Sequence, residues 1–395
     1  MPAFCTHIQD IMNTEIAKSF TQLYGEGGEI ATYFCPGRVN LIGEHIDYNG
    51  GFVFPAALTL GITSLVRKRA DSIVRFSSMS MEGTFEIDLR SVLEKKTEYQ
   101  WANYPIGVLS FLIMEGYSIQ GADVLFSSTL PDGAGVSSSA AIEVLTTYLF
   151  LYENGDVDPD KVWISRFAQK VENKFIGVNC GIMDQFSVAN GKANQAILLN
   201  CNNLNFSYFP VQLGEYKLVI LNTNKRRELA ESKYNERRSE CDSALAILRK
   251  HSQYSDLCSA NMEAVNEFIP DPVLKARARH VITENNRVLE ACNVLERGNL
   301  ARFGELLNES HFSLRDDYEV TGKELDTITE SARNHPACLG ARMTGAGFGG
   351  CGIALVKEAE MAGFIDKVGQ AYREICKLEP AFYVSEIGDG VRKLF

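Results

Sequence analysis

The sequence predicts an α+β protein with two domains. At 395 residues the chain is too long for one average domain and suits two. Short strand patterns and helical patterns both recur along it, which favours mixed layers of helix and sheet. The composition changes near residue 212, where a continuous apolar run is followed by long charged helical stretches. We therefore expect one domain over residues 1–212 and a second over 213–395.

Composition and charge exclude several classes of protein. With 45% hydrophobic and 23% charged residues, the chain has enough apolar mass for packed cores. The formal net charge of −11 argues against nucleic-acid binding, which requires clustered Lys and Arg. The start has no basic segment followed by an apolar core, and no apolar run reaches the ~20 residues that span a bilayer. We expect a cytoplasmic protein that does not associate with membranes.

The ten cysteines are scattered, with no CxxC pair and no metal-like clustering with the six histidines. In a chain of this length they indicate reduced, mostly buried thiols rather than a disulfide framework or a zinc site.

In the N-terminal half, residues 51–90 alternate β-branched or aromatic runs with turn signals and predict several strands. Residues 101–116 and 138–152 have apolar residues at helical spacing, and residues 121–130 between them predict a strand that ends at Pro131. A second helical pattern over 160–175 leads into CGIMDQF, and AILLNC then predicts another strand.

In the C-terminal half, YKLVILNTN predicts a buried strand, and charged helices follow to about residue 335. A glycine-rich stretch from Ala341 leads into the strand pattern CGIALV, and the end of the chain predicts one further strand and a tail. No internal repeat or low-complexity segment is present.

The strongest local signal is LPDGAGVSSSAA, residues 130–141, which lies between a predicted strand and a predicted helix. Glycines let a backbone approach a ligand closely, and the free N–H groups at a helix N-terminus attract an anion. The pattern predicts a phosphate-binding loop. A serine-capped helix without a ligand is the alternative, since Ser is a preferred N-cap. The loop is not a Walker loop, because GxxxxGK[ST] is absent, as are the protein-kinase patterns HRD and DFG.

Residues 345–350, GAGFGG, satisfy the dinucleotide pattern GxGxxG. In a dinucleotide site the pattern follows a strand and opens a helix, whereas here it precedes the strand CGIALV. We therefore expect no NAD site. The alternatives are a second backbone loop against a substrate or the first loop, and a plain glycine turn.

Two further segments concentrate polar side chains. Residues 35–51, CPGRVNLIGEHIDYNGG, place hydrogen-bonding groups between glycines, which suits a sugar whose hydroxyls donate and accept; a polar surface turn is the alternative. Asp184 in CGIMDQF is a carboxylate among apolar residues, and we expect a cation, with Arg38 the candidate, to keep it charged. Taken alone, such an aspartate is more often a helix cap or a surface residue.

Taken together these segments resemble the galactokinases, a branch of the GHMP small-molecule kinase family. The resemblance rests on PGRVNLIGEHIDYNGG, PDGAGVSSSAA, CGIMDQF, ESKYNERR and MTGAGFGGCGIALV, which span residues 35–356 in the expected order. The first segment is specific to galactokinases, whereas the phosphate loop alone indicates only the wider family. One departure is Ile46, which stands where the signature usually has Thr, and we expect at most a local change in packing.

The resemblance implies roles for individual residues. Asp184 matches the catalytic aspartate, and Arg38 matches the arginine that stabilises it and the developing charge. Sugar contacts are implied for Glu44, His45, Asp47, Gly181 and Tyr234. Nucleotide contacts are implied for Gly133, Ala134, Gly135, Val136, Ser137, Ser138 and Ser139. Mg²⁺ ligands are implied for Ser139 and Glu172.

The same resemblance implies the fold and the reaction. The fold is the two-domain GHMP kinase fold, an α+β domain like ribosomal protein S5 domain 2 followed by the GHMP C-terminal α+β domain, with the site between them. The reaction is ATP-dependent phosphorylation of galactose at the anomeric hydroxyl to galactose 1-phosphate, the first committed step of galactose catabolism. Mg²⁺ is the implied cofactor, galactose and ATP are the implied partners, and a monomer or weak homo-oligomer is expected.

Two other functions stay open at this point. A relative that phosphorylates N-acetylgalactosamine or another sugar would share every phosphate contact. A regulator that binds sugar and ATP without efficient catalysis belongs to a different class, although SSSAA, Asp184 and Arg38 are all present here. The basic residues Lys225, Arg226, Arg227, Lys233, Arg237 and Arg238 alternate with Glu228, Glu231 and Glu236, and predict a solvated mixed-charge helix rather than a polyanion site.

Overall fold

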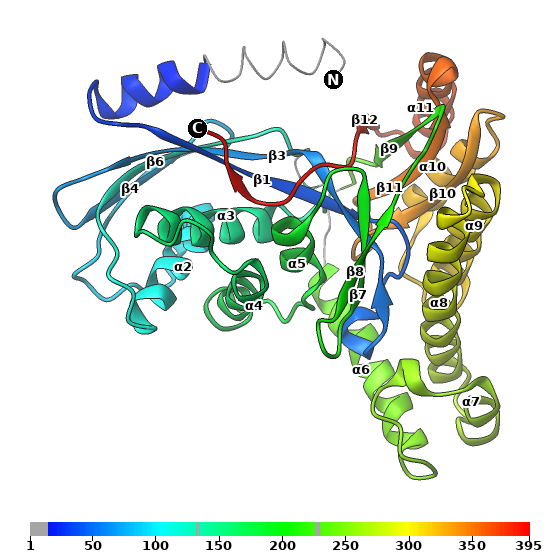
Figure 1. The fold of residues 1–395 in the computed structure, drawn as a ribbon. Helices are drawn as coiled ribbons and strands as arrows, with labels where there is room; N and C mark the ends of the chain where they lie inside the picture. Colours follow the sequence, from blue (N-terminus) through cyan, green and yellow to red (C-terminus); the bar gives the residue numbers. More distant parts are fainter. Residues whose placement is uncertain (1–14, 132, 134, 226–229) are drawn as a thin grey trace.

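The computed structural model describes residues 15–131, 133, 135–225 and 230–395, and confirms the α+β class. Figure 1 shows one large sheet with helices beneath it, joined to a second sheet that is backed by a stack of long helices. Among the described residues, no helix combines the length and the apolar character needed to cross a membrane.

The larger sheet has six strands in the order β13-β1-β3-β6-β4-β5. Within it, β4 and β6 run parallel and all other neighbours are antiparallel. The strands are β1 (Ala31–Asn40), β3 (Pro55–Lys68), β4 (Ile73–Ser78), β5 (Thr84–Asp88), β6 (Ala122–Ser128) and β13 (Arg392–Lys393). The end of the chain thus returns to the sheet that contains its first strand.

Four helices cover one face of this sheet (Figure 1). They are α2 (Asn103–Met114), α3 (Ser138–Glu153), α4 (Lys161–Val171) and α5 (Met183–Asn190). Residues 15–24 form a helix on the opposite face, where Ile16 and Phe20 pack on Leu65 and Leu125. The predicted helices over 101–116 and 138–152 and the strand over 121–130 are confirmed, whereas the N-terminal helix and β1 were not predicted.

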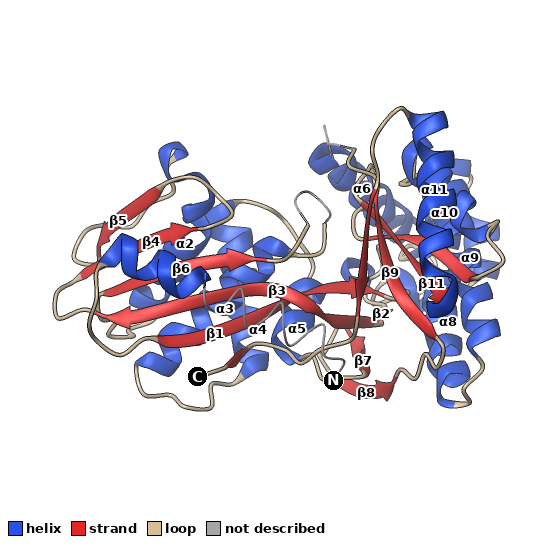
Figure 2. Cartoon of the chain, turned by 90° about the horizontal axis from the view of Figure 1, so that it is seen from above, coloured by secondary structure: helices blue, strands red, loops and turns tan. Residues whose placement is uncertain are grey.

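The second sheet has four antiparallel strands in the order β10-β11-β9-β12. They are β9 (Tyr216–Asn222), β10 (Cys338–Thr344), β11 (Cys351–Lys357) and β12 (Ala381–Ser385). Long helices pack beside it, as the view from above in Figure 2 shows. The helices of this half are α6 (Ala230–Leu248), α7 (Met262–Phe268), α8 (Pro272–Glu296), α9 (Leu300–Asp316), α10 (Lys323–Arg333) and α11 (Met361–Cys376).

A small sheet in the order β2-β7-β8 lies between the two halves of the chain (Figure 2). Its strands are β2 (Phe52–Val53), β7 (Gln195–Asn200) and β8 (Phe206–Pro210), and short 3₁₀ turns are η1 (Asp47–Asn49), η2 (Thr97–Ala102), η4 (Leu257–Ser259) and η5 (Glu358–Glu360). The largest hydrophobic cluster includes Val39 and Phe54 from the N-terminal half and Val288 and Met343 from the C-terminal half. The two halves therefore share a core, and the division at residue 212 stays a prediction.

The nine cysteines in the described part of the chain are free thiols. The prediction of a wholly solvated mixed-charge helix is wrong for Arg237. This side chain is 5% exposed, because its guanidinium donates to the Tyr318 carbonyl oxygen and pairs with Glu240. Arg226, Arg227 and Glu228 lie outside the described residues.

Candidate active site

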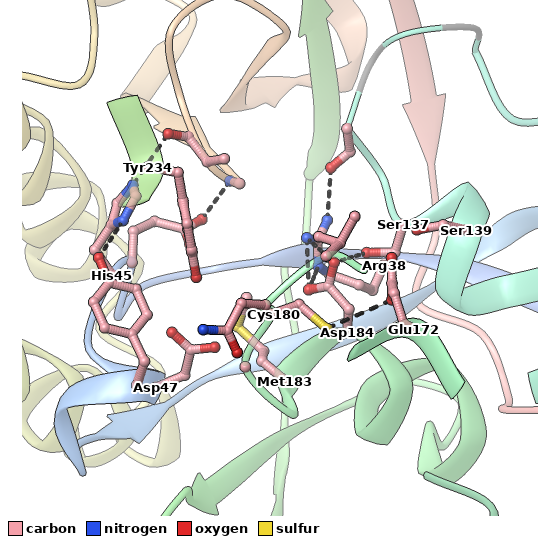
Figure 3. Close-up of a pocket in the computed structure, with 18 of the residues that line it drawn as sticks. Arg38, His45, Asp47, Ser137, Ser139, Glu172, Cys180, Met183, Asp184 and Tyr234 are labelled. Atoms are coloured by element: carbon pink, nitrogen blue, oxygen red, sulfur yellow. Dashed lines mark hydrogen bonds and ion pairs between the residues drawn. The ribbon is translucent and has the colours of Figure 1, made fainter. Parts of the chain in front are cut away.

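A cavity of about 460 Å³ gathers the predicted site residues from both halves of the chain. In Figure 3, His45, Asp47 and Tyr234 lie on one side of Cys180 and Met183, and Arg38, Ser137, Ser139, Glu172 and Asp184 lie on the other. The lining also includes Glu44, Gly133, Gly135, Ser138 and Gly181. The predicted residue Ala134 lies outside the described residues.

The loop before α3 leaves the N-terminus of that helix uncapped. Ser137 occupies the N-cap position in a left-handed conformation, with φ 66°, and its side chain makes no capping hydrogen bond. Its hydroxyl donates instead to Asp184 Oδ2, at 2.6 Å. The alternative of a plain serine-capped helix is therefore wrong. Ser137, Ser138 and Ser139, at the start of this 16-residue helix, line the cavity, and a helix N-terminus of this kind attracts an anion.

Val136 is the one predicted loop residue in the described chain that does not line the cavity. Its side chain is buried in the core, and its carbonyl oxygen accepts the N–H of Arg38 at 3.1 Å. This bond joins the loop to β1.

Arg38 reaches the cavity because β1 changes register between Pro36 and Arg38. A bulge of this kind redirects a side chain out of the regular strand pattern. Gly37 is required at the bulge, since a Cβ there would lie 2.5 Å from Leu130 Cδ2 and 2.7 Å from the Val136 carbonyl oxygen.

Arg38 and Asp184 form the ion pair that the sequence predicts. Nε of Arg38 donates to Asp184 Oδ1 at 2.8 Å, and Nη2 donates to Oδ2 at 2.7 Å. Nη1 donates to the Gly135 carbonyl oxygen at 2.8 Å, so one guanidinium joins the carboxylate to the loop (Figure 3). Asp184 lies in the first turn of α5, where an acidic residue is favoured by the helix dipole. A bidentate pair holds the carboxylate in one orientation.

Glu172 lies near this pair (Figure 3), at the start of a single π-turn, η3 (Glu172–Ile176), which follows α4 directly. Such turns often occur at functional sites because they shift a side chain out of the helical register. Burial, followed by the nearby charge of Asp184, raises the pKa of Glu172. Its carboxylate accepts from Gln185 Nε2 at 2.5 Å and lies beside the Ser139 side chain (Figure 3).

The segment 43–49 forms the other end of the cavity and is not a surface turn. Glu44 is 1% exposed and His45 is 4% exposed. Glu44 Oε1 accepts the N–H of Gly345 at 2.7 Å and lies 2.9 Å from the Thr344 hydroxyl. The glycine loop between β10 and β11 therefore packs against this segment and is more than a plain glycine turn. Gly345 and Ala346 also line the cavity, and contact of this loop with a substrate stays a prediction. Ile46 is fully buried, in agreement with a local packing role.

Both ring nitrogens of His45 have protein partners. Nε2 lies 3.1 Å from the Ala346 carbonyl oxygen, which can only accept, so Nε2 carries the proton. Nδ1 then accepts from the Tyr48 hydroxyl at 2.8 Å, and Tyr48 contacts the Tyr318 hydroxyl. Burial lowers the pKa of His45 to about 3, so the ring is neutral. This residue fixes the wall of the cavity through uncharged hydrogen bonds.

Asp47 and Gly181 are in close contact. A Cβ on Gly181 would lie 1.7 Å from Asp47 Oδ2, so only glycine leaves room for the carboxylate. Burial, followed by the charge of Asp184, raises the pKa of Asp47 to about 7. Tyr234 from α6 borders the same region, with its ring 5.6 Å from that of His45.

Several residues that line the cavity were not singled out from the sequence. They are Tyr104, Val178, Asn179, Cys180, Met183 and Asn235. Asn179, Cys180 and Met183 flank Gly181 and Asp184 in the chain, so proximity to a predicted residue could have indicated them. Tyr104 on α2 carries no local signal of this kind.

Comparison with known proteins agrees with this geometry. Three family models match: the galactokinase galactose-binding signature over residues 18–68, the GHMP kinase N-terminal domain over 103–192, and the GHMP kinase C-terminal domain over 289–374. A galactokinase from Enterococcus faecalis is 50% identical, covering 97% of this chain and 100% of that protein. One from Clostridium tetani is 49% identical, covering 96% and 97%.

Among solved structures, Lactococcus lactis galactokinase complexed with galactose is 44% identical and superposes with a TM-score of 0.92, covering 97% of this chain and 100% of that one. Similarity at this level over nearly the whole length, together with a cavity that unites the signature segments, shows that the chain belongs to the galactokinase family of GHMP kinases.

Proposed function

We propose that this protein transfers the γ-phosphate of ATP to the anomeric hydroxyl of galactose and releases galactose 1-phosphate and ADP. One observation carries the proposal. A single cavity connects an uncapped helix N-terminus, suited to phosphate, with a buried segment of carboxylates suited to sugar hydroxyls, and Asp184 lies between them. The galactose in the related Lactococcus lactis structure supports the choice of sugar.

The triphosphate would bind the main-chain N–H groups of the loop before α3. Gly133 and Gly135 both have positive φ, at 65° and 70°, a conformation in which successive N–H groups can face an anion. Ser138 and Ser139 follow at the start of α3, and we include them in the nucleotide site together with Gly133, Gly135 and Ser137. Tyr104 also borders this end of the cavity.

Mg²⁺ fits the residues beside this loop. Mg²⁺ prefers oxygen ligands and is usually bound by one or two carboxylates together with substrate phosphates. Ser139 and Glu172 supply a hydroxyl and a carboxylate that lie side by side in the cavity (Figure 3). Burial, followed by the charge of Asp184, raises the pKa of Glu172, and a bound cation would offset both effects. When bound, Mg²⁺ would neutralise charge on the β- and γ-phosphates. We propose Ser139 and Glu172 as its protein ligands.

Asp184 and Arg38 would act on the transferred group. A carboxylate has about four lone-pair positions, and three of those on Asp184 accept from Arg38 and Ser137. The remaining position can accept the anomeric hydroxyl, orient it and take its proton. Arg38 stabilises the negative charge that develops between the two reactants. Because phosphoryl transfer passes through a largely dissociative transition state, positioning contributes more than proton removal.

Galactose would bind at the other end, between Glu44, Asp47 and Tyr234. The carboxylates accept from sugar hydroxyls, and a phenol can donate or accept. Gly181 leaves space for Asp47, and His45 supports the wall through Tyr48 and Ala346.

The broader expectations stay proposals. We propose that the cavity marks the junction of two domains, 1–212 and 213–395, that the protein is a monomer or weak homo-oligomer, and that it acts in the cytoplasm. The net charge of −11 supports the absence of a nucleic-acid partner.

A panel of sugars tests the proposal. ADP release would be measured with ATP, Mg²⁺ and galactose, N-acetylgalactosamine, glucose or no sugar, and the phosphate position in the product would be determined by ³¹P NMR. We expect galactose to give the highest kcat/KM and a 1-phosphate product. Preference for N-acetylgalactosamine would replace the substrate in this proposal, and sugar binding without ADP release would favour a regulator.

A further inference from the structure

Arg342 is a charged side chain that is fully buried behind the sugar end of the cavity. It lies on β10, three residues before Gly345, where the loop that contacts Glu44 begins. Its Nη1 donates to the carbonyl oxygens of Asn40 and Leu41, at 3.1 and 2.9 Å. Arg342 therefore joins the second sheet to the end of β1, directly before the segment that carries Glu44 and His45.

The same guanidinium faces Glu44. Nη2 lies 3.4 Å from Glu44 Oε1, and both side chains are almost completely buried. This oxygen is also the one that accepts from Gly345 N–H and contacts the Thr344 hydroxyl. All three of these contacts fall on Oε1, and Glu44 borders the cavity, so the contacts made by the described residues leave Oε2 for a ligand.

The surroundings give Arg342 few other partners. Within the described part of the chain, its Nε and Nη2 make no hydrogen bond although both are buried, and Glu44 is the carboxylate that Nη2 faces. Glu284, also buried, accepts from Arg287 at 2.7 Å and from Gly43 N–H at 2.9 Å. Burial lowers the pKa of His280 to about 4 and also lowers that of His311, so neither ring repels Arg342 strongly at neutral pH.

A buried arginine whose guanidinium is incompletely hydrogen-bonded contributes little to the stability of a fold. Burying an ion costs several kcal/mol, and apolar residues of similar volume often stabilise a core as well or better. An incompletely bonded buried polar group calls for another explanation. The contact between Arg342 and Glu44, a carboxylate at the sugar end of the cavity, supplies this explanation.

We propose that Arg342 is a positioning residue for sugar recognition, which holds Glu44 from behind so that Glu44 Oε2 faces a hydroxyl of the bound hexose. The inference rests on the proposed function, in which Glu44 binds the sugar. It assigns to the second sheet a direct part in sugar specificity, through Arg342 on the strand and Gly345 on the following loop.

The experiment couples protein variants to missing hydroxyls on the substrate. Galactose and its 2-, 3-, 4- and 6-deoxy analogues would be compared as substrates of the wild type and of the variants Glu44→Gln, Arg342→Met and Arg342→Lys. In the wild type, the analogue that lacks the partner of Glu44 should lose on the order of 10–100-fold in kcat/KM, the range for a hydrogen bond to a charged group. The variant Glu44→Gln identifies this hydroxyl: in that variant, removing the partner hydroxyl from galactose should lower kcat/KM by only a few-fold.

For Arg342→Met we expect a smaller loss in kcat/KM with the analogue that lacks the same hydroxyl, and an unchanged loss with the other analogues. KM for ATP should stay within about twofold of the wild-type value. Arg342→Lys keeps the charge but has one nitrogen where Arg342 uses Nη1 for the carbonyl oxygens and Nη2 for Glu44, so it should give an intermediate result. Should Arg342→Met fail to fold, Arg342→Lys decides by the same comparison.

Arg333→Met is the matched control. Arg333 also donates to a main-chain oxygen of β10, that of Ala341 at 2.9 Å, and it is not among the residues lining the cavity. In this control, the loss in kcat/KM with each deoxy analogue should equal that of the wild type. This inference alone would be overturned if the wild type is active and the Arg342 variants lose as much kcat/KM as the wild type does with every deoxy analogue. A wild type that neither phosphorylates nor binds galactose would overturn the proposed function and this inference with it.

Discussion

Replacing Gly181 by alanine is expected to weaken galactose binding without harming the fold. The new Cβ would lie 1.7 Å from Asp47 Oδ2 and 2.6 Å from Asp47 Cγ. Since a carbon–oxygen contact needs at least about 3.0–3.4 Å, the carboxylate has to move by more than 1 Å, on the order of one bond length. Gly181 does not have a positive φ, so alanine brings no backbone strain and the clash is the whole perturbation.

The size of the effect follows from what Asp47 would bind. A displaced carboxylate loses hydrogen bonds to the sugar worth about 1.5–3 kcal/mol, which corresponds to roughly 10–100-fold in affinity. We expect KM for galactose to rise by this factor, while KM for ATP and the melting temperature stay close to those of the wild type. Steady-state kinetics with each substrate varied in turn, and a thermal melt, measure all three.

Gly363→Ala is the control, because a Cβ on this glycine in α11 meets nothing within 4 Å. It should leave both KM values unchanged and stabilise the helix by up to about 1 kcal/mol. An unchanged KM for galactose in Gly181→Ala would refute the placement of the sugar beside Asp47.

Four further predictions concern three carboxylates of the cavity. Asp184→Asn should lower kcat by about 10²–10⁴-fold with the fold retained, measured by turnover and circular dichroism. Because the pKa of Asp47 is raised to about 7, this group is protonated below that pH and cannot accept fully from the sugar, so kcat/KM for galactose should rise as the pH increases through about 7. The same shift makes the folded state less stable as the pH rises from about 4 to 7, and Asp47→Asn should remove this loss in urea titrations. Glu172→Gln should raise the Mg²⁺ concentration for half-maximal activity by at least about tenfold, and Mg·ADP titration calorimetry gives an independent measure.

Each of these predictions has an outcome that contradicts it. Near-normal turnover in Asp184→Asn would remove this residue from the reaction. A flat pH profile between 5 and 9, or one unchanged in Asp47→Asn, would mean that Asp47 is ionised throughout or does not meet the sugar; this range brackets the expected pKa by about two units. Unaltered Mg²⁺ dependence in Glu172→Gln would place the cation elsewhere.

Much of the fold followed from local patterns. The strand over 122–128, the helix over 138–153 and the loop between them are signalled by apolar periodicity and glycines within a short window, and the structure has them there. The helix α11 was missed, although Phe364, Val368 and Tyr372 recur at helical spacing and are all buried. The apolar periodicity of this helix is therefore visible in the sequence alone.

Other features depend on contacts between distant segments, which periodicity does not report. The bond from Gly345 to Glu44 joins residues 301 positions apart, and this contact places the GAGFGG loop beside Glu44. The bulge that aims Arg38 depends on the pairing of β1 with β3 and on the nearby phosphate loop. Burial of Arg237 likewise depends on Tyr318, which lies 81 positions away. The residues of the site were indicated by motif, whereas their partners came only from the tertiary structure.

The central claim is that one cavity holds the terminal phosphate of ATP against the anomeric hydroxyl of galactose. The most direct test is a crystal structure of the ternary complex with galactose, Mg²⁺ and a non-hydrolysable ATP analogue. The account predicts the phosphates on the N–H groups around residues 133–139, and the γ-phosphorus about 3–3.5 Å from an anomeric oxygen that contacts Asp184. A triphosphate bound away from this loop, or a sugar whose anomeric oxygen points away from Asp184, would contradict it.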